Sequence, residues 1–437
     1  MAMAKKVRNP LQPTLFEEDE VESVSRPKTS STFADNMALP VHRWFRYSAG
    51  FSAIWVRETI QAAVVGNKSG LRVLDPFAGS GTVLIEAERA KVPAIGVESH
   101  PFVARLAKAK MGIGTDADKF RSYARELLKR AEMVRPNIEE YSPLIRKCYP
   151  DTVLAALDQL RTAWLQDENQ AEKELGWLAL AAILRQCSPV GTANWQYVLP
   201  KKTKAKTSNP FDAYKAKANQ ICLDLAERPK DAPEPKLIQG DARAMTEVPD
   251  GWASLVVTSP PYPNNFDYAD ATRLEMTFFG DIVGWGDLQG AVRKYLVRSC
   301  TQHVSPIVGD TSTLIASPEL DPIRSEIEAV VDSLEKARHD HGGKKNYHTM
   351  IAAYFLDMAK VWKALRRVTS PNARVCFVIG DSAPYSVYVP VDAWMGRLAV
   401  ASGFRSFTFN KTRDRNIKWK NRKHRVPLHE GRLWAEG

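Results

Sequence analysis

The stretch VLDPFAGSGTVLIEAERAKVPAIGVE, residues 73–98, decides the fold of this chain. Its first five residues form an apolar run typical of a buried strand, and residues 94–98 form a second one. Between them, residues 81–91 place apolar side chains at helical spacing. Strand, helix and strand in this order predict a parallel sheet with helices on its faces. We therefore predict an α/β fold of the Rossmann-like class.

The same alternation resumes only at residue 236. Further strands are predicted at KLIQGDA, SLVVTSPPY, ARVCFVIGD and FRSFTFN, with helices over 349–368 and 391–402. Residues 113–235 have helical spacing instead, as does most of 263–346. The prediction is therefore a disordered tail (1–38), a first half of the core (39–112), a helical insertion (113–235) and a second half (236–437). That second half contains the insertion at about 263–346 and ends in a basic segment.

The composition excludes several classes of protein. Of 437 residues, 44% are hydrophobic, but no apolar run approaches the roughly 20 residues that a membrane span needs. Five cysteines stand singly and the N-terminus lacks an apolar signal region, which favours a reducing cytoplasm over secretion. Lysine and arginine number 61 against 50 acids, a net charge of +11 that favours a polyanionic partner, above all nucleic acid.

Asp75-Pro-Phe-Ala-Gly-Ser-Gly-Thr82 joins the first strand to its helix. Glycines there let backbone approach a ligand at a helix N-terminus. The loop lacks the Gly-Lys-Ser/Thr of a phosphate-binding loop and the third glycine of a dinucleotide fingerprint. Glu98 ends the next strand, where an acid binds ribose hydroxyls. The alternatives are a tight turn and a solvent-exposed glutamate.

Two further groups follow predicted strands. Asp241 comes after KLIQG and can accept a hydrogen bond from an adenine amino group, or it can cap the turn that begins there. Thr258-Ser-Pro-Pro-Tyr262 ends the next strand, and its two prolines stop the strand and remove two backbone donors. The Ser259 hydroxyl and the carbonyls are then acceptors for an amino group on a planar ring, beside the Tyr262 ring. The alternative is a rigid turn without a ligand.

All four groups fall at the carboxyl ends of parallel strands, where open α/β sheets bind ligands. In combination they resemble the S-adenosylmethionine-dependent amino-methyltransferases that act on DNA. The segment from His42 to Val56 is similar to that family's N-terminal cofactor motif, and residues 262–280 to a bacterial branch of it. The resemblance implies a mostly parallel sheet of seven strands. It also implies S-adenosyl-L-methionine as cofactor, held by Phe51, Ser52, Asp75, Pro76, Phe77, Gly79, Gly81, Thr82, Glu98, Asp241 and Thr258.

The resemblance further implies Ser259, Pro260, Pro261 and Tyr262 as catalytic residues. Serine at position 259 is typical of enzymes that methylate cytosine N4, whereas adenine-N6 enzymes more often carry Asp or Asn there. No Pro-Cys occurs, so the thiolate chemistry of cytosine C5 methylation is absent. The predicted reaction is direct methyl transfer to an exocyclic amine of a flipped base. The alternatives are adenine N6, an RNA methyltransferase of the same fold, and a non-catalytic nucleic-acid-binding protein.

Basic residues in two segments are candidate nucleic-acid contacts, with a merely solvated surface as the alternative. They are Lys201, Lys202, Lys204 and Lys206 in the helical insertion, and Arg413, Arg415, Lys418, Lys420 and Arg422 near the C-terminus. The helical insertion is also a candidate target-recognition region. No zinc motif occurs, and His339, His341 and His348 are interpreted as solvent-facing, so we expect no metal.

The N-terminal tail contains one short apolar motif. Gln12, Leu15 and Phe16 resemble the peptide that docks on bacterial sliding clamps, although Pro13 departs from the commoner pattern. The alternative is that the apolar pair packs on the folded domain or has no role. The sequence predicts neither the oligomeric state nor the recognition site.

Overall fold

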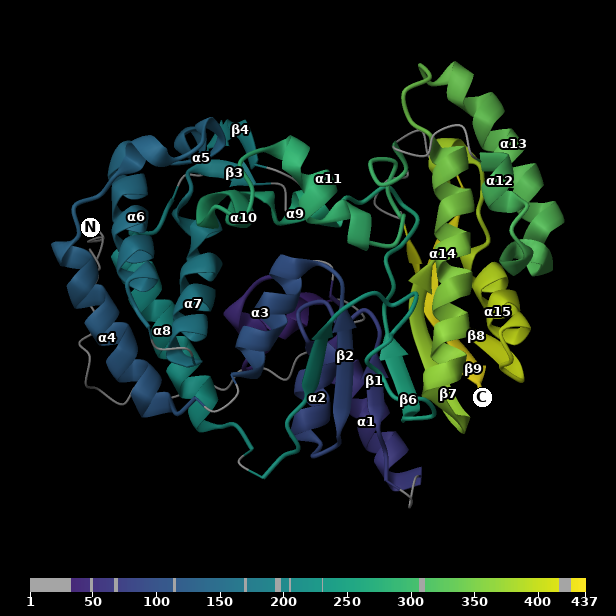
Figure 1. Ribbon diagram of the computed structural model, residues 1–437, viewed down its shortest axis with the longest axis horizontal. Coiled ribbons are helices and arrows are strands. Elements are labelled where there is room, and N and C mark those ends of the chain that lie inside the picture. Colours follow the sequence, from purple (N-terminus) through teal and green to yellow (C-terminus); the bar gives the residue numbers. More distant parts are fainter. Residues whose placement is uncertain are drawn as a thin grey trace, which may run out of the picture.

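A seven-stranded sheet forms the centre of the computed structural model (Figure 1). The structure describes residues 33–47, 50–66, 70–112, 115–168, 171–192, 198–203, 206–229, 231–305, 311–415 and 426–437. The strand order is β5-β2-β1-β6-β7-β9-β8. The strands are β1 (Val73–Asp75), β2 (Ala94–Glu98), β5 (Lys236–Gln239), β6 (Ala253–Thr258), β7 (Thr369–Gly380), β8 (Ser406–Arg415) and β9 (Leu428–Glu436). The predicted α/β class and seven strands are confirmed.

The first five strands in this order are parallel, and β9 runs antiparallel to both β7 and β8. The strand order reverses at β1, which lies between β2 and β6. Ligands of open α/β sheets bind at such a reversal, outside the carboxyl ends of the strands. Strand β9 was not predicted. It lies between β7 and β8 in the sheet, although it follows both of them in the sequence.

Helices cover both faces of the sheet, so alternate residues of a strand enter different cores. Val73 and Val257 belong to a core with α1 (Ala53–Gly66), α2 (Thr82–Arg89) and α3 (Pro101–Met111). Leu74 and Val256 face the other way, into a core with α14 (Tyr347–Val368) and α15 (Val391–Ala401). Burial on both faces explains why these strands are continuous apolar runs.

The block between α3 and β5 lies to one side of the sheet (Figure 1). It comprises α4 (Ala117–Met133), η3 (Ile138–Glu140), α5 (Pro143–Cys148), α6 (Asp151–Leu165), α7 (Ala171–Cys187) and α8 (Pro210–Ala226). A two-stranded antiparallel sheet, β3 (Val190–Thr192) and β4 (Val198–Thr203), interrupts it. The sequence predicts a polar, basic loop at 201–206 between the helices, and the first three of those residues belong to β4 instead.

The second insertion is mostly helical, as predicted, and divides into two parts. The helices α9 (Tyr268–Ala271), α10 (Arg273–Phe279) and α11 (Leu288–Ala291), with η4 (Trp285–Asp287) and η5 (Arg293–Tyr295), share a hydrophobic core with the helical block. The rest, α12 (Thr311–Ile315), η7 (Pro318–Ile323) and α13 (Arg324–Asp340), packs beside α14. The η8 turn (Pro384–Ser386) follows β7.

Ordered chain begins earlier than expected. The turn η1 (Phe33–Ala38) lies within the range predicted to be disordered, and η2 (His42–Trp44) follows it. Asn36 explains the difference, because its side chain bonds the Phe51 carbonyl at 2.9 Å and the Ala53 amide at 2.9 Å and so ties η1 to the start of α1. Among the described residues, no helix is long and apolar enough to cross a membrane.

Candidate active site

The loop after β1 turns sharply through two glycines. Gly79 and Gly81 have φ angles of +53° and +85°, a region that side chains disfavour. The Ala78 amide donates to the Val97 carbonyl at 2.9 Å, and the Gly79 amide donates to the Glu98 carboxylate at 2.8 Å. The loop is thereby held against the end of β2, and Thr82 begins α2 directly after it.

Glu98 accepts hydrogen bonds from backbone on both of its oxygens. The Gly79 amide reaches one and the His100 amide the other, each at 2.8 Å. The side chain is half-buried, and burial raises its pKa above the ordinary value. Each carboxylate oxygen has two lone-pair sites, so both retain capacity for ligand hydroxyls.

Asp75 lies beneath the pocket as a buried carboxyl, 1% exposed. One oxygen accepts from the Thr258 hydroxyl at 2.6 Å and from the Phe77 amide at 3.0 Å. The other oxygen, Oδ2, has no hydrogen-bond partner among the described residues. Burial raises the pKa of Asp75 to about 7. Buried acceptors normally have partners, so Oδ2 is an exception, and Asp75 itself is not in the lining of the pocket described below.

The Ser259-Pro-Pro-Tyr262 loop leaves β6 and is fixed from behind. The Ser259 hydroxyl donates to the Val378 carbonyl at 3.1 Å, which leaves its lone pairs available as acceptors. The Tyr354 hydroxyl donates to the Pro261 carbonyl at 2.9 Å. Tyr262 lies beside the Arg415 guanidinium, whose carbon is 5.2 Å from the ring centroid.

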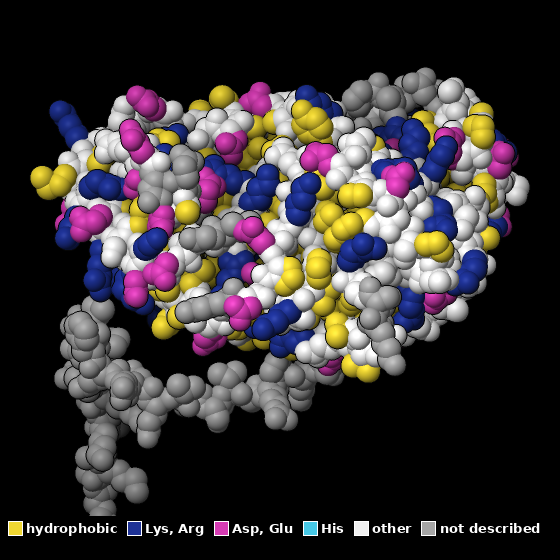
Figure 2. Space-filling model, turned by 60° about the horizontal axis from the view of Figure 1, so that its bottom comes forward, with side chains coloured by type: hydrophobic (Ala, Val, Ile, Leu, Met, Phe, Trp, Pro, Cys, Tyr) yellow, Lys and Arg dark blue, Asp and Glu magenta, His cyan; other side chains and the backbone are white. Residues whose placement is uncertain are grey.

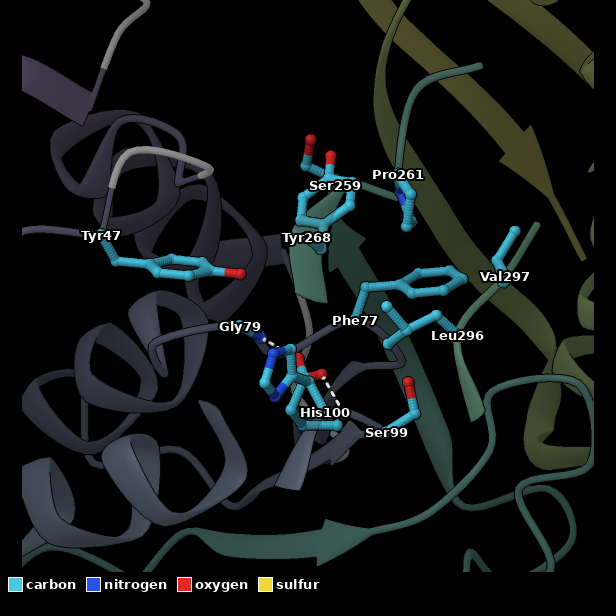
Figure 3. A pocket seen from close by; sticks show the side chains of 11 residues that line it. Tyr47, Phe77, Gly79, Ser99, His100, Ser259, Pro261, Tyr268, Leu296 and Val297 are labelled. Atoms are coloured by element: carbon cyan, nitrogen blue, oxygen red, sulfur yellow. Dashed lines mark hydrogen bonds between the residues drawn. The ribbon is translucent and has the colours of Figure 1, made fainter. Parts of the chain in front are cut away.

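A pocket lies between the loop after β1, the end of β2 and the loop after β6, and the predicted catalytic residues Pro260 and Tyr262 are not in its lining (Figure 3). Its lining comprises Tyr47, Phe77, Gly79, Glu98, Ser99, His100, Ser259, Pro261, Tyr268, Leu296 and Val297. Five of these residues were predicted: Phe77, Gly79, Glu98, Ser259 and Pro261. Asp75 and Thr258 support the pocket from below through their hydrogen bond. The lining combines aromatic and apolar side chains with the polar residues Glu98 and Ser259 at two strand ends. Such a combination suits a ligand that has both a planar base and a sugar.

Sequence reasoning missed the other six lining residues, namely Tyr47, Ser99, His100, Tyr268, Leu296 and Val297. The ring of Tyr47 extends toward the pocket in Figure 3, and burial raises the pKa of its hydroxyl well above the ordinary value. His100 is buried, its Nε2 lies 2.9 Å from the Thr272 hydroxyl, and burial lowers its pKa to about 4, so the ring is neutral at pH 7. The position of His100 two residues after Glu98 was the one signal available for it.

Phe51 and Ser52 are buried at the start of α1 and are not in the lining of this pocket. Phe51 packs on Trp55, with ring centroids 6.0 Å apart, and Ser52 accepts from the Trp55 amide at 3.3 Å. Pro76, Gly81 and Thr82 form the turn into α2, behind the lining. Their contact with a cofactor stays a prediction.

Asp241 is engaged elsewhere. Its carboxylate accepts from the Arg243 amide at 2.8 Å and from Arg243 Nε at 2.9 Å, so it caps the turn after β5. Arg243 also contacts the buried Asp357 at 3.2 Å. The capping alternative is therefore what the structure contains, and Asp241 does not line the pocket. Its role toward adenine stays a prediction.

The candidate nucleic-acid residues are dispersed. Arg415 lies against Tyr262, Arg413 pairs with Glu430 at 2.9 Å, and Lys206 is exposed. Lys201 and Lys202 lie in β4. Figure 2 shows acids and bases mixed on the lower face of the molecule, without a single basic patch there. Outside the described residues lie Lys204, Lys418, Lys420, Arg422, Gln12, Leu15 and Phe16.

The interpretation of the histidines was wrong for one of the three. His339 and His341 are exposed, but His348 is 6% exposed near the start of α14, because that helix is buried along most of its length. Within the described segments, one group has metal-ligand spacing, namely Asp381, Asp392 and His429. Its members already bond one another, with His429 Nδ1 2.7 Å from Asp381.

Known proteins resemble this chain along most of its length. No family model matches it. The Type II methyltransferase M.AvaI of Nostoc sp. is 26% identical over 421 residues, covering 88% of this chain and 82% of that protein, and the protein of the same name from Anabaena variabilis gives the same values. M.BsoBI of Geobacillus stearothermophilus is 25% identical over 438 residues, covering 89% and 82%. The chain is therefore similar, across both halves of the sheet and the insertions, to Type II methyltransferases.

Proposed function

We propose that the chain is a DNA methyltransferase that uses S-adenosyl-L-methionine to methylate an exocyclic amine of a base, with cytosine N4 the favoured target. One observation carries the proposal. Ser259 and Pro261 of the amine-binding motif line the same pocket as Gly79 and Glu98. A methyl donor and an amine acceptor must meet at one place, and the pairing of β2, β1 and β6 as neighbouring strands brings these two groups together. The similarity to Type II methyltransferases supports the same reaction.

The residues of the pocket fit the cofactor. Glu98 has lone pairs left for two ribose hydroxyls, and Phe77 with the neighbouring apolar residues supplies a wall for a planar ring. Asp75 Oδ2 is a buried acceptor without a partner among the described residues. Bound S-adenosyl-L-methionine would supply an electrophilic methyl on a positively charged sulfur.

The chain's own residues activate the amine. The lone pair of a base amine is delocalised into its ring, so the amine is a poor nucleophile. Ser259 Oγ and the Pro260 carbonyl accept its two protons as hydrogen bonds and favour a tetrahedral nitrogen. These bonds strengthen as positive charge develops, which is where stabilisation accelerates the reaction. Asp75 positions the loop that carries these acceptors, because it accepts at 2.6 Å from the hydroxyl of Thr258, the residue before Ser259.

A base that is stacked inside a duplex cannot enter a pocket. The target base therefore has to leave the duplex to reach the Ser259 loop. Tyr262 offers a face for it to stack on, beside the Arg415 guanidinium. Serine at position 259 supports cytosine over adenine through the family resemblance. Adenine N6 is the second candidate, since both amines need the same acceptors.

Incubation with methyl-labelled S-adenosylmethionine and either duplex DNA or total RNA tests the proposal. After digestion to nucleosides, mass spectrometry should find N4-methylcytosine from DNA. N6-methyladenine alone would reverse the base assignment, label in RNA alone would reverse the substrate, and no label would favour a binding protein. Ser259→Ala and Tyr262→Ala should bind the cofactor normally and lose methylation. Ser254→Ala, at the amino end of β6, is the matched control and should stay active.

A further inference from the structure

A second pocket adjoins the Ser259-Pro-Pro-Tyr262 loop. Its lining comes from five separate segments: Asn264 after the loop, the turn between α13 and α14, the residues that follow β7, the end of β8 and the start of β9. The lining residues used below are Lys344, Lys345, Tyr347, His341, Tyr385 and Arg415. We call this the lateral pocket.

The lateral pocket is tied directly to the catalytic loop. The Asn264 amide donates to the Tyr262 carbonyl at 2.8 Å, and the Ser382 hydroxyl donates to the Pro263 carbonyl at 2.5 Å. Arg415 spans the two sites, because its guanidinium lies 5.2 Å from the Tyr262 ring and donates to the Asp381 carbonyl at 2.7 Å. If one base of a DNA strand lies at Tyr262, the next nucleotide of that strand would therefore reach the lateral pocket.

Positive charge gathers at the lateral pocket. Lys344 and Lys345 are exposed, and Arg415 is half-buried. The one acid in the lining, Asp381, is 1% exposed and already bonds His429 at 2.7 Å and the Tyr388 hydroxyl at 3.0 Å. The three cations therefore face the opening without an exposed acid among the lining residues. A phosphate is the ligand that such a set prefers.

Aromatic rings form the wall beside these cations. The His341 and Tyr385 rings stack with centroids 4.4 Å apart, and Tyr347 meets Tyr385 edge-on at 4.7 Å. Tyr385 and Ser386 have φ angles of +50° and +63°, which strain a non-glycine backbone. Strain of this kind clusters at ligand sites, where the surrounding structure enforces it.

The turn that carries the two lysines is fixed in place. Gly342 and Gly343 adopt φ angles of +76° and +71°, and the Arg338 carbonyl accepts from the Gly343 amide at 3.0 Å. Arg338 Nε donates back to the Gly343 carbonyl at 2.8 Å. Residues 339–345, which include Lys344 and Lys345, are thus held against the strained Tyr385 turn.

We propose that the lateral pocket binds the DNA strand beside the flipped base, with Lys344, Lys345 and Arg415 on a phosphate and the Tyr385 wall against the adjoining nucleotide. The inference rests on the proposed function and adds a substrate contact to it. Phosphate contacts of this kind position the strand without reading its sequence. They should therefore contribute to DNA affinity and to its salt dependence, and leave the cofactor site unaffected.

The test combines Lys344→Gln with Lys345→Gln in the full-length chain. The matched control combines Lys360→Gln with Lys363→Gln, which are exposed lysines on α14 about 20 Å along the helix from Tyr347. Fluorescence anisotropy with a labelled duplex should give about tenfold weaker binding for the first pair, and a plot of log affinity against log salt whose slope is smaller by about 1–2. The control should match the wild-type chain.

Kinetics supply the second readout. The Lys344/Lys345 pair should raise KM for DNA about tenfold and leave kcat at saturating DNA and the S-adenosylmethionine affinity unchanged. Tyr385→Asn tests the wall separately, because asparagine tolerates a positive φ and removes the ring. It should raise KM for DNA without altering the salt slope.

The outcomes separate the two proposals. A wild-type chain that methylates DNA, with both lysine pairs indistinguishable in affinity and salt slope, would overturn the lateral pocket alone. A wild-type chain that transfers methyl groups to neither DNA nor RNA would overturn the proposed function. A chain that methylates RNA and not DNA would overturn the assignment of both sites to DNA.

Discussion

Two neighbouring strands of the sheet, β2 and β5, each end in an acid, and the two acids have opposite environments. Among the described residues, the hydrogen bonds of Glu98 at the end of β2 come from backbone amides, and Glu98 lines the pocket. Asp241, two residues after β5, pairs with Arg243, which also contacts Asp357. A carboxylate that bonds only amides keeps its charge for a ligand, whereas one beside a guanidinium is already neutralised. Position at a strand end therefore does not by itself make an acid a ligand-binding residue.

The largest expected effect is on stability, at Asp357, which shares Arg243 with Asp241. Asp357 is 1% exposed and accepts from Arg298 at 2.9 and 2.6 Å as well as from Arg243. Asp357→Ala leaves two half-buried guanidiniums without this partner. We expect the free energy of unfolding to fall by about 3–5 kcal/mol, measured by urea denaturation. A loss under 1 kcal/mol would mean that water replaces the carboxylate and that the cluster is not structural.

Asp75→Asn should have the next largest effect, on catalysis. The substitution keeps the shape of the side chain, but an amide has one acceptor oxygen where the carboxyl group has two, which disturbs the contact with Thr258 that positions the Ser259 loop. We expect the single-turnover methylation rate to fall about 10²–10³-fold, with cofactor affinity changed much less. Asp241→Asn is the matched control at the other strand end, and an equal loss of rate there would break the comparison.

Glu98→Ala should weaken S-adenosylmethionine binding by about 1–3 kcal/mol, because a charged hydrogen-bond acceptor is lost. Asp241→Ala should weaken it by less, since Arg243 already occupies that carboxylate. Calorimetric titration of both variants measures the difference. An equal loss of affinity in both variants would indicate that Asp241 contacts the cofactor directly. Unchanged affinity in Glu98→Ala would show that Glu98 does not bind the cofactor.

The smallest expected effect is a pH dependence. Burial raises the pKa of Asp75 from 3.8 to about 7, so the folded chain holds a proton there that the unfolded chain releases between those values. The free energy of unfolding should therefore decrease as pH rises through this window. Asp75→Asn should flatten that decrease without abolishing it, because burial raises the pKa of Glu98 in the same direction. Urea denaturation at about pH 5 and about pH 7.5 measures both slopes, and identical slopes would contradict the raised pKa.

Local pattern was sufficient for the elements that carry the site. Residues 73–98 predict the strand, glycine loop, helix and strand correctly, because each apolar period is a property of consecutive residues. The Thr258-Ser-Pro-Pro-Tyr262 loop was likewise placed at a strand end by its own prolines. Local pattern failed at β9, where a strand rich in charged and polar residues pairs between β7 and β8, and at the hairpin of β3 and β4.

The sequence by itself determined six of the seven strands, the order of the motifs and the polar residues at the ends of β1, β2 and β6, since connectivity forces parallel strand ends to one edge. Only the tertiary structure decided that Tyr47 and Tyr268 close the pocket, that Asp241 belongs to Arg243, and that Lys344 and Lys345 stand beside Tyr385. The physical reason is that these contacts join segments far apart in the chain. Their geometry depends on how the helices pack on the sheet, which no local period encodes.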